Sequence, residues 1–197
     1  MIQYHYIDGQ TPIDEDEKRD IIPILITRED LDAFEQENIL EAREWLMKKS
    51  TLSKINIFTE EFILSLHKRM FRHVWKWAGK FRKSNKNIGA EHYDVPVQLR
   101  QLLDDARYWL KNDTYNPTEL AVIFHYRLVK IHLFPNGNGR HARLVADTIV
   151  AKYGAKPLTW GGNFDLTKPD DIRKRYIKAL HKADEGDYQP LIKFATS

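Results

Sequence analysis

The sequence predicts an all-α fold, an orthogonal helical bundle that carries one short β-hairpin as an exposed flap. Three observations predict this fold. Apolar residues recur at three- and four-residue steps through several segments, capping residues bound some of these segments, and one stretch lacks any such period. The chain has 197 residues, 42% of them hydrophobic, which is enough to bury one core. We therefore expect a single helical domain.

The apolar periodicity predicts six helices along the chain. The clearest start is at Asn116, which can cap a helix whose first residue is Pro117 and whose third is Glu119. Gly154 is a suitable residue to end the following helix. The expected helices cover residues 30–49, 59–77, 98–110, 117–131 and 140–153, and a last one that begins near Pro169 and passes through Ala183.

The expected flap lies in residues 80–96, KFRKSNKNIGAEHYDVP, which contain Asn, Ser and Gly and close on Pro96. This composition is typical of a loop or short hairpin that projects from a helical body. Its lysines, Lys83 and Lys86, can attract phosphate or an acidic target, or can simply lie in solvent.

Composition excludes several function classes. The chain has no cysteine, which removes disulfides, thiolate nucleophiles and Cys-based zinc sites. Its net charge of +3 is too small to indicate a nucleic-acid partner. No apolar run reaches the roughly 20 residues that cross a bilayer, and the start resembles no signal peptide, so we expect a cytoplasmic protein with no membrane partner.

Residues 1–28 are rich in charge and turn-formers and predict an N-terminal extension with a regulatory role. The acidic run at residues 14–17 within it is typical of a solvated leader. Residues 29–197 then form the expected catalytic domain.

One segment has the features of an anion site, the run from His132 to Arg143, HLFPNGNGRHAR. A helix ends there, a glycine-bearing turn follows, and a second helix starts at once. The first N–H groups of that helix lack partners and lie at the positive end of its dipole. Arg140 and Arg143 occupy one face of its first turn, where guanidinium groups can bind phosphate oxygens in pairs. This arrangement predicts a polyphosphate site.

Two further side chains of the run can carry chemistry. His132 lies at the end of the preceding helix, and a neutral imidazole there can deprotonate an incoming hydroxyl group. Asn136 offers a carbonyl oxygen to a Mg²⁺ ion that is bound to the phosphates.

The same run resembles the signature HxFx(D/E)GNGRxxR of the Fic family. The resemblance extends over roughly residues 35–195 and includes the helix before the motif and the closing segment RKRYIKALHKADEGDYQPLIKF. Within the family, the chain looks most similar to the small bacterial proteins called mobile mystery protein B. The signature positions that agree are His132, Phe134, Gly137, Asn138, Gly139, Arg140 and Arg143.

The resemblance implies a protein adenylyltransferase that moves AMP from ATP to a Ser, Thr or Tyr hydroxyl of a target protein. His132 would be the general base, and Gly137, Asn138 and Gly139 would hold the phosphates. Arg140 and Arg143 would bind the β- and γ-phosphates, and Phe134 would anchor the turn. Adenosine contacts would come from Tyr176, Ile177 and Asp184, although Asp184 replaces an Asn of some relatives. The target would dock on the flap at Asn87, Ile88 and Gly89.

One departure concerns the metal site, because position 136 holds Asn where the family pattern has Asp or Glu. An amide oxygen is a weaker ligand than a carboxylate, so we expect weakened Mg²⁺ binding. Related branches with changes near this position transfer UMP, phosphate or phosphocholine, which keeps the transferred group open. A nucleotide-binding module without catalysis is the alternative from another class.

The resemblance also implies control by a glutamate within (S/T)xxxE(G/N). Glu37 is followed by Asn38 but has Ala33 in place of Ser or Thr, whereas Glu15 follows Thr11 at the correct spacing but precedes Asp16. Both glutamates are candidates for such an inhibitory helix. A separate antitoxin partner is the alternative, in which case the enzyme would act as a toxin.

Overall fold

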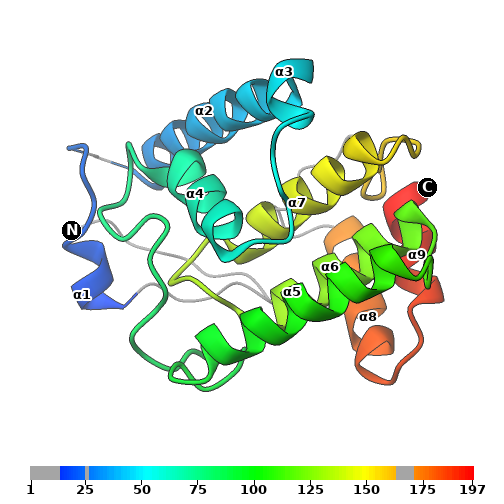
Figure 1. Cartoon of the computed structure of the whole chain (residues 1–197). Coiled ribbons are helices and arrows are strands. Elements are labelled where there is room, and N and C mark those ends of the chain that lie inside the picture. Colours follow the sequence, from blue (N-terminus) through cyan, green and yellow to red (C-terminus); the bar gives the residue numbers. More distant parts are fainter. Residues whose placement is uncertain (1–13, 25–26, 163–170) are drawn as a thin grey trace.

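The computed structural model of the chain describes residues 14–24, 27–162 and 171–197, and these residues form a helical bundle (Figure 1). Their only β-bridge joins Ile21 to Trp75. None of the described helices is long and apolar enough to cross a membrane. The helices are α1 (Glu15–Lys18), α2 (Arg28–Met47), α3 (Lys49–Leu52), α4 (Glu60–Phe71), α5 (Val95–Lys111), α6 (Pro117–Ile131), α7 (Asn138–Lys152), α8 (Asp171–Asp184) and α9 (Gln189–Thr196).

The core forms around the antiparallel pair α6 and α7. Helices α2 and α4 pack on α7, α5 and α9 pack on α6, and α8 packs on α9 (Figure 1). Helix α6 begins as the sequence predicts, because the Asn116 side chain accepts hydrogen bonds from the backbone of Thr118 and Glu119. The pair therefore presents the turn between α6 and α7 on a rigid support.

The helix expected over residues 59–77 ends at Phe71, so its predicted length is wrong. Tertiary contacts draw the following residues out of the helix. The indole of Trp75 donates a hydrogen bond to Glu35 at 2.6 Å, and the backbone N–H of Lys76 donates to Asp20 at 2.9 Å.

The expected β-hairpin is also wrong in detail, because residues 80–94 form an irregular loop without a β-ladder. The carbonyl groups of Ser84 and Ala90, which a ladder would use, instead accept hydrogen bonds from the Arg82 guanidinium. This segment still projects from the helical body, and we keep the name flap for it.

The other helix boundaries lie close to their predicted positions. Helix α5 begins a turn early, at Val95, with Pro96 in its first turn. Helix α7 begins at Asn138, two residues before the expected start. The predicted start of the last long helix, Pro169, lies outside the described residues, as does Thr11 of the extension.

Candidate active site

The turn between α6 and α7 contains two residues in the left-handed conformation. His132 ends α6 with φ 58°, and Gly137 precedes α7 with φ 79°. A Cβ atom on Gly137 would lie 2.5 Å from Cζ of Phe71, so only glycine fits at this position. The chain thus reverses direction within a few residues, and His132 comes next to the N-terminus of α7.

Asn138 closes this turn through its side chain. Its amide oxygen accepts a hydrogen bond from the backbone N–H of Phe134 at 2.9 Å, and its amide nitrogen donates to the carbonyl of the same residue at 2.8 Å. The side chain is buried and does not point toward a ligand. Any contact of Asn138 with phosphate must therefore come from its backbone N–H in the first turn of α7.

His67 of α4 is a site residue that sequence reasoning missed. Its Nδ1 accepts a hydrogen bond from the backbone N–H of Gly79 at 3.0 Å, which leaves the proton on Nε2, 3.1 Å from the carbonyl oxygen of Asn136. The ring also stacks on Phe134, with 3.6 Å between ring centroids. Burial, followed by the charge of His141, lowers the pKa of His67, so this support stays neutral.

His132 lies in the turn with only 4% of its surface exposed. Burial, followed by the positive charges of Arg82 and Lys86, lowers its pKa to about 3. The imidazole is therefore neutral near pH 7 and able to accept a proton. This pKa is well below the value near the working pH that suits a general base, because burial and the neighbouring positive charges oppose protonation.

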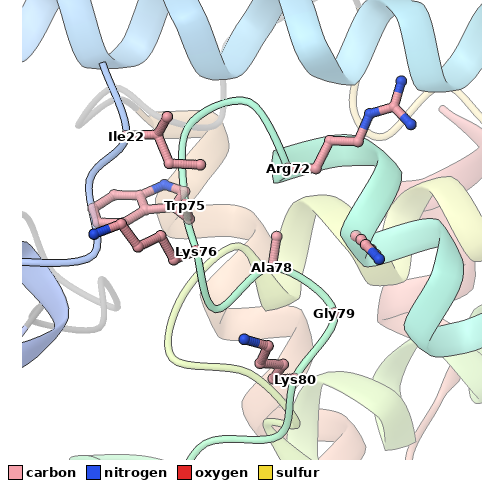
Figure 2. A pocket seen from close by; sticks show the side chains of 8 residues that line it. Ile22, Arg72, Trp75, Lys76, Ala78, Gly79 and Lys80 are labelled. Atoms are coloured by element: carbon pink, nitrogen blue, oxygen red, sulfur yellow. The ribbon is translucent and has the colours of Figure 1, made fainter. Parts of the chain in front are cut away.

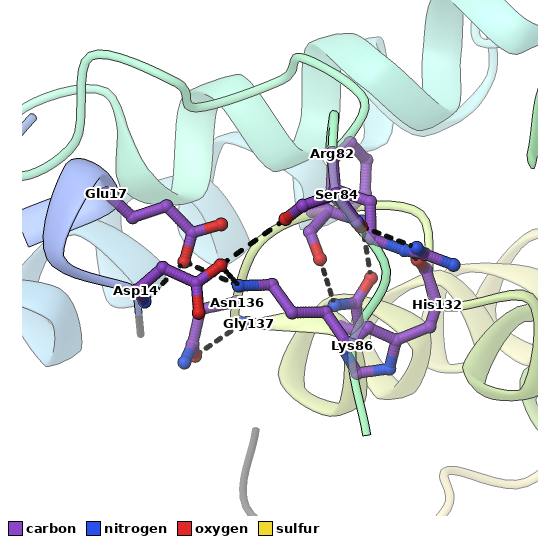
Figure 3. Close-up of polar contacts among 10 residues, drawn as sticks. Asp14, Glu17, Arg82, Ser84, Lys86, His132, Asn136 and Gly137 are labelled. Atoms are coloured by element: carbon purple, nitrogen blue, oxygen red, sulfur yellow. Dashed lines mark hydrogen bonds and ion pairs between the residues drawn. The ribbon is translucent and has the colours of Figure 1, made fainter. Parts of the chain in front are cut away.

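Arg82 is the second site residue that sequence reasoning missed. It is 2% exposed, and its Nε donates a hydrogen bond to the backbone carbonyl of His132 at 2.6 Å (Figure 3). The remaining guanidinium donors bind the carbonyls of Ser84 and Ala90 in the flap. Its position after an aromatic residue in a loop, KFRKSN, gave no signal of burial.

The N-terminal acidic run contacts the flap and is not a freely solvated leader. Asp14 and Glu17 each lie 2.7 Å from Nζ of Lys86, whose side chain is 2% exposed (Figure 3). The hydroxyl of Ser84 also donates to Asp14 at 3.3 Å. A buried ammonium next to His132 is thereby neutralised by two carboxylates.

A glutamate does bind a motif arginine, but it is neither of the two that the sequence suggested. Glu35 of α2 is 3% exposed and lies 2.5 Å from Nη1 of Arg140. Glu37 is exposed, and Glu15 pairs with Lys18. The helical period explains the difference, because Glu35 follows buried Leu31 by one turn and shares its face, whereas Glu37 lies on the other face.

Arg143 lies deeper than Arg140, with its guanidinium carbon 5.8 Å from the centre of the Tyr176 ring. Burial lowers the pKa of Arg143, and the hydroxyl group of Tyr176 and the carboxylate of Asp147 partly compensate. The two arginines are close enough to repel each other, since the charge of Arg140 also lowers the pKa of Arg143. A bound polyanion would relieve this repulsion.

The three residues expected to contact adenosine occupy different environments. Tyr176 is buried, and its hydroxyl lies 3.0 Å from Nε2 of His125. Ile177 packs partly buried against the core. Asp184 accepts hydrogen bonds from Tyr126 at 2.8 Å and from Lys130 at 2.6 Å. Of the three flap residues, Asn87 and Ile88 are exposed, and Gly89 lies against His132.

Asn136 offers little to a metal ion by itself. Its side-chain oxygen accepts a hydrogen bond from the backbone N–H of Gly137 at 2.6 Å and lies 3.4 Å from Nη2 of Arg140. The described residues contain no group of three or more His, Cys, Asp or Glu that could hold a metal. One neutral oxygen fits Mg²⁺ only where phosphate oxygens supply most of the ligands.

A cavity of about 340 Å³ lies at the C-terminal end of α4, apart from the motif residues (Figure 2). Its lining includes the apolar side chains of Trp75 and Ile22 and four exposed cationic side chains. The backbone of Gly79, which also lines it, donates to His67 behind the motif turn. The cationic residues are Lys68, Arg72, Lys76 and Lys80.

Comparison with known proteins agrees with the sequence resemblance. Residues 57–150 match the model of the Fic/DOC family. The relative named protein adenylyltransferase Fic of Drosophila melanogaster is 32% identical in an alignment of 180 positions that covers 87% of this chain and 35% of the relative. The chain thus spans about a third of the length of the curated relatives it matches.

Solved structures give the same fold. Fic-1 of Caenorhabditis elegans (residues 134–508) is 29% identical and superimposes with a TM-score of 0.64 over 91% of this chain and 51% of its own. BepC of Bartonella tribocorum, solved with bound AMPPNP, is 15% identical and superimposes with a TM-score of 0.61 over 84% of each chain.

Four buried histidines predict a loss of stability in acid. Burial lowers the pKa of His125, His132 and His141 to about 3 and also lowers that of His67. In the unfolded chain each takes up a proton near pH 6.5. The unfolded state therefore binds more protons as pH falls from about 6.5 toward 3, and the free energy of unfolding should fall by up to about 1.4 kcal/mol per histidine per pH unit.

Urea unfolding at pH 7.5, 6.5 and 5.5 measures this slope. A His125→Asn variant, which cannot take up the proton, should have a slope smaller by about one proton. A stability that does not change between pH 7.5 and 5.5 would contradict the assignment of neutral buried rings.

Proposed function

Because the chain belongs to the Fic/DOC family, we propose that it is a protein adenylyltransferase, which transfers AMP from ATP to a Ser, Thr or Tyr hydroxyl of another protein. One observation carries the proposal. A single turn joins the neutral imidazole of His132 to a helix N-terminus that bears Arg140 and Arg143. The names of the curated relatives support the same activity.

The proposed reaction uses these groups in one displacement. The target hydroxyl gives its proton to His132, and its oxygen attacks the α-phosphorus of ATP. The bond from the α-phosphorus to the oxygen that bridges to the β-phosphate breaks, and pyrophosphate leaves. Arg140, Arg143 and the N–H groups of residues 137–139 stabilise the negative charge that moves onto the leaving group.

Mg²⁺ would neutralise phosphate charge in this reaction, held by the phosphates and by the side-chain oxygen of Asn136. That oxygen would first have to leave its hydrogen bond to Gly137. Tyr176, Ile177 and Asp184 stay our candidates for the adenosine contacts. Asn87 and Ile88, both exposed on the flap, are the candidates for docking the target.

Control of the activity is a separate proposal. Glu35 binds Arg140 in the ligand-free chain, so a triphosphate has to compete with a buried carboxylate. Several expectations from the sequence stay predictions. They are the division into a regulatory extension, residues 1–28, and a catalytic domain, residues 29–197, together with an antitoxin partner, action as a toxin and a cytoplasmic location.

Asn136 favours a second candidate, a Fic transferase that moves UMP, phosphate or phosphocholine. A neutral ligand at this position weakens the hold on the metal, and the donor molecule could then differ from ATP. Mass spectrometry of a modified target separates these groups by their masses. ATP binding without any transfer would instead favour a nucleotide-binding module.

The first prediction concerns the base. Incubation with α-labelled ATP, Mg²⁺ and a cell lysate should label a protein band, and His132→Ala should reduce the labelling by at least about 100-fold because the hydroxyl loses its proton acceptor. His73→Ala, at an exposed position that makes no hydrogen bond to the described motif residues, is the matched control and should label normally. Equal labelling by both variants would refute the proposal.

The second prediction concerns the metal. Asn136→Asp adds a carboxylate ligand, so Mg²⁺ should support binding of an ATP analogue at a concentration about five-fold lower, which corresponds to about 1 kcal/mol. Calorimetric titrations of the analogue at several Mg²⁺ concentrations measure this shift. Asn112→Asp, which makes the same charge change at an exposed site beyond α5, should produce no shift. The metal role of position 136 fails if the two variants behave alike.

The third prediction concerns Glu35. Glu35→Gln removes the carboxylate that competes for Arg140, so the variant should bind an ATP analogue several-fold more tightly. The same change leaves a partly buried guanidinium without its counterion and should cost roughly 1–3 kcal/mol of stability. Calorimetry and urea unfolding test both parts.

Glu37→Gln is the matched control for this variant, since Glu37 is exposed on the same helix and was the candidate from sequence. It should change neither the affinity nor the stability. Tighter binding by Glu37→Gln than by Glu35→Gln would reverse our assignment.

A further inference from the structure

Arg82 is a buried cation that no carboxylate neutralises within ion-pair distance among the described residues. Burial lowers its pKa, and the charge of Glu91 only partly opposes this effect. Its side-chain donors are bound to backbone carbonyl groups instead, those of His132, Ser84 and Ala90. Moving a guanidinium out of water costs free energy, and three uncharged carbonyl groups offset this cost less than a carboxylate would. The contacts of Arg82 therefore point to a role beyond simple packing.

The three carbonyls belong to two segments that the proposed reaction must bring together. Ser84 and Ala90 lie at the two ends of the flap tip, and His132 is the proposed base. Two backbone hydrogen bonds reinforce the junction. The N–H of Arg82 donates to Leu133 at 3.0 Å, and the N–H of Ala90 donates to Ile131 at 3.3 Å. Both ends of the flap therefore lie against the backbone that carries His132.

Gly89 provides an independent observation of the same junction. It has φ +106°, and a Cβ atom built on it would lie 2.5 Å from Cβ of His132. The flap thus touches the proposed base directly, at a point where no side chain fits between them. A change in the path of the flap would shift His132, and the reverse also holds.

We propose that Arg82 is a positioning residue that fixes the flap to the backbone of His132, so that a hydroxyl presented on the flap meets the imidazole. This inference rests on the proposed transferase function. His132 caps the C-terminus of α6, where carbonyl groups lack helical donors, and its carbonyl accepts a hydrogen bond from Nε of Arg82. The Arg82 side chain therefore fixes the positions of both the flap, where the target would dock, and His132.

The positioning role predicts that loss of the Arg82 side chain slows transfer without weakening nucleotide binding. Among the described residues, Arg82 has no hydrogen bond to the motif residues expected to hold phosphate, which are Gly137, Asn138, Gly139, Arg140 and Arg143. Loss of Arg82 should leave the phosphate site intact and misplace the hydroxyl relative to His132. A displacement of about 1 Å can reduce a rate by about 100-fold.

The test compares Arg82→Met and Arg82→Lys with Arg100→Met, which removes an exposed arginine of α5. We expect Arg82→Met to bind a non-hydrolysable ATP analogue with Mg²⁺ within about three-fold of wild type and to transfer label from α-labelled ATP about 100-fold more slowly. Arg82→Lys should restore little of the transfer rate, because an ammonium group lacks the planar set of donors that reaches three carbonyl groups. Arg100→Met should match wild type in both measurements.

Hydrogen exchange tests the junction without reference to activity. The amides of residues 84–91 should exchange faster in Arg82→Met than in wild type, since the carbonyls of Ser84 and Ala90 lose their donor and the hydrogen bond from the N–H of Ala90 to Ile131 is held less firmly. If the wild-type chain transfers no label, the proposed function fails, whereas faster exchange with unchanged analogue binding still supports the junction.

Gly89→Ala serves as a second variant that leaves the buried charge in place, should Arg82→Met fail to fold. Its Cβ would press on His132, so it should show the same loss of transfer with retained analogue binding. The proposal is overturned if either folded variant transfers at the wild-type rate. Equal losses of transfer and analogue binding would also overturn it, since they indicate a general structural role.

Discussion

Two hydrogen bonds between the Asn138 side chain and the backbone of Phe134 close the turn on which the rest of the site depends. The amide makes both bonds from a buried position, so the turn cannot open without leaving a polar group unsatisfied. His67 supports the outer part of the turn through the carbonyl of Asn136 and through stacking on Phe134. Packing of α6 against α7 holds this assembly in the middle of the bundle.

Around this turn the chain concentrates positive charge and balances it with carboxylates from distant segments. Glu35 neutralises Arg140, and Asp14 and Glu17 neutralise Lys86. Glu35, Glu17 and Lys86 lie largely out of water, where partners attract strongly but desolvation is costly, whereas the Asp14 side chain is half exposed. A polyphosphate that binds Arg140 would therefore compete with the carboxylate of Glu35 for the guanidinium.

The features that could be predicted from the sequence are those that depend on residues close together in the chain. Asn116 and Pro117 mark the start of α6 because capping acts within four residues, and the glycines of the turn follow from backbone sterics. Arg82 and His67 escaped prediction because the turn residues that they bind, His132 and Asn136, lie 50 and 69 residues away in the chain. Glu35 shares a helical face with buried Leu31, but the spacing of the inhibitory motif pointed to Glu37 and Glu15 instead.

The contact between α1 and the flap has a practical consequence for any shortened form of this protein. A chain that starts after Lys18 would lack Asp14 and Glu17, and Lys86 would carry an uncompensated ammonium close to His132. That charge would oppose protonation of the imidazole even more strongly and would draw anions from the buffer. Rates and affinities measured on such a truncated protein would describe an altered electrostatic field, not the one that the full chain provides.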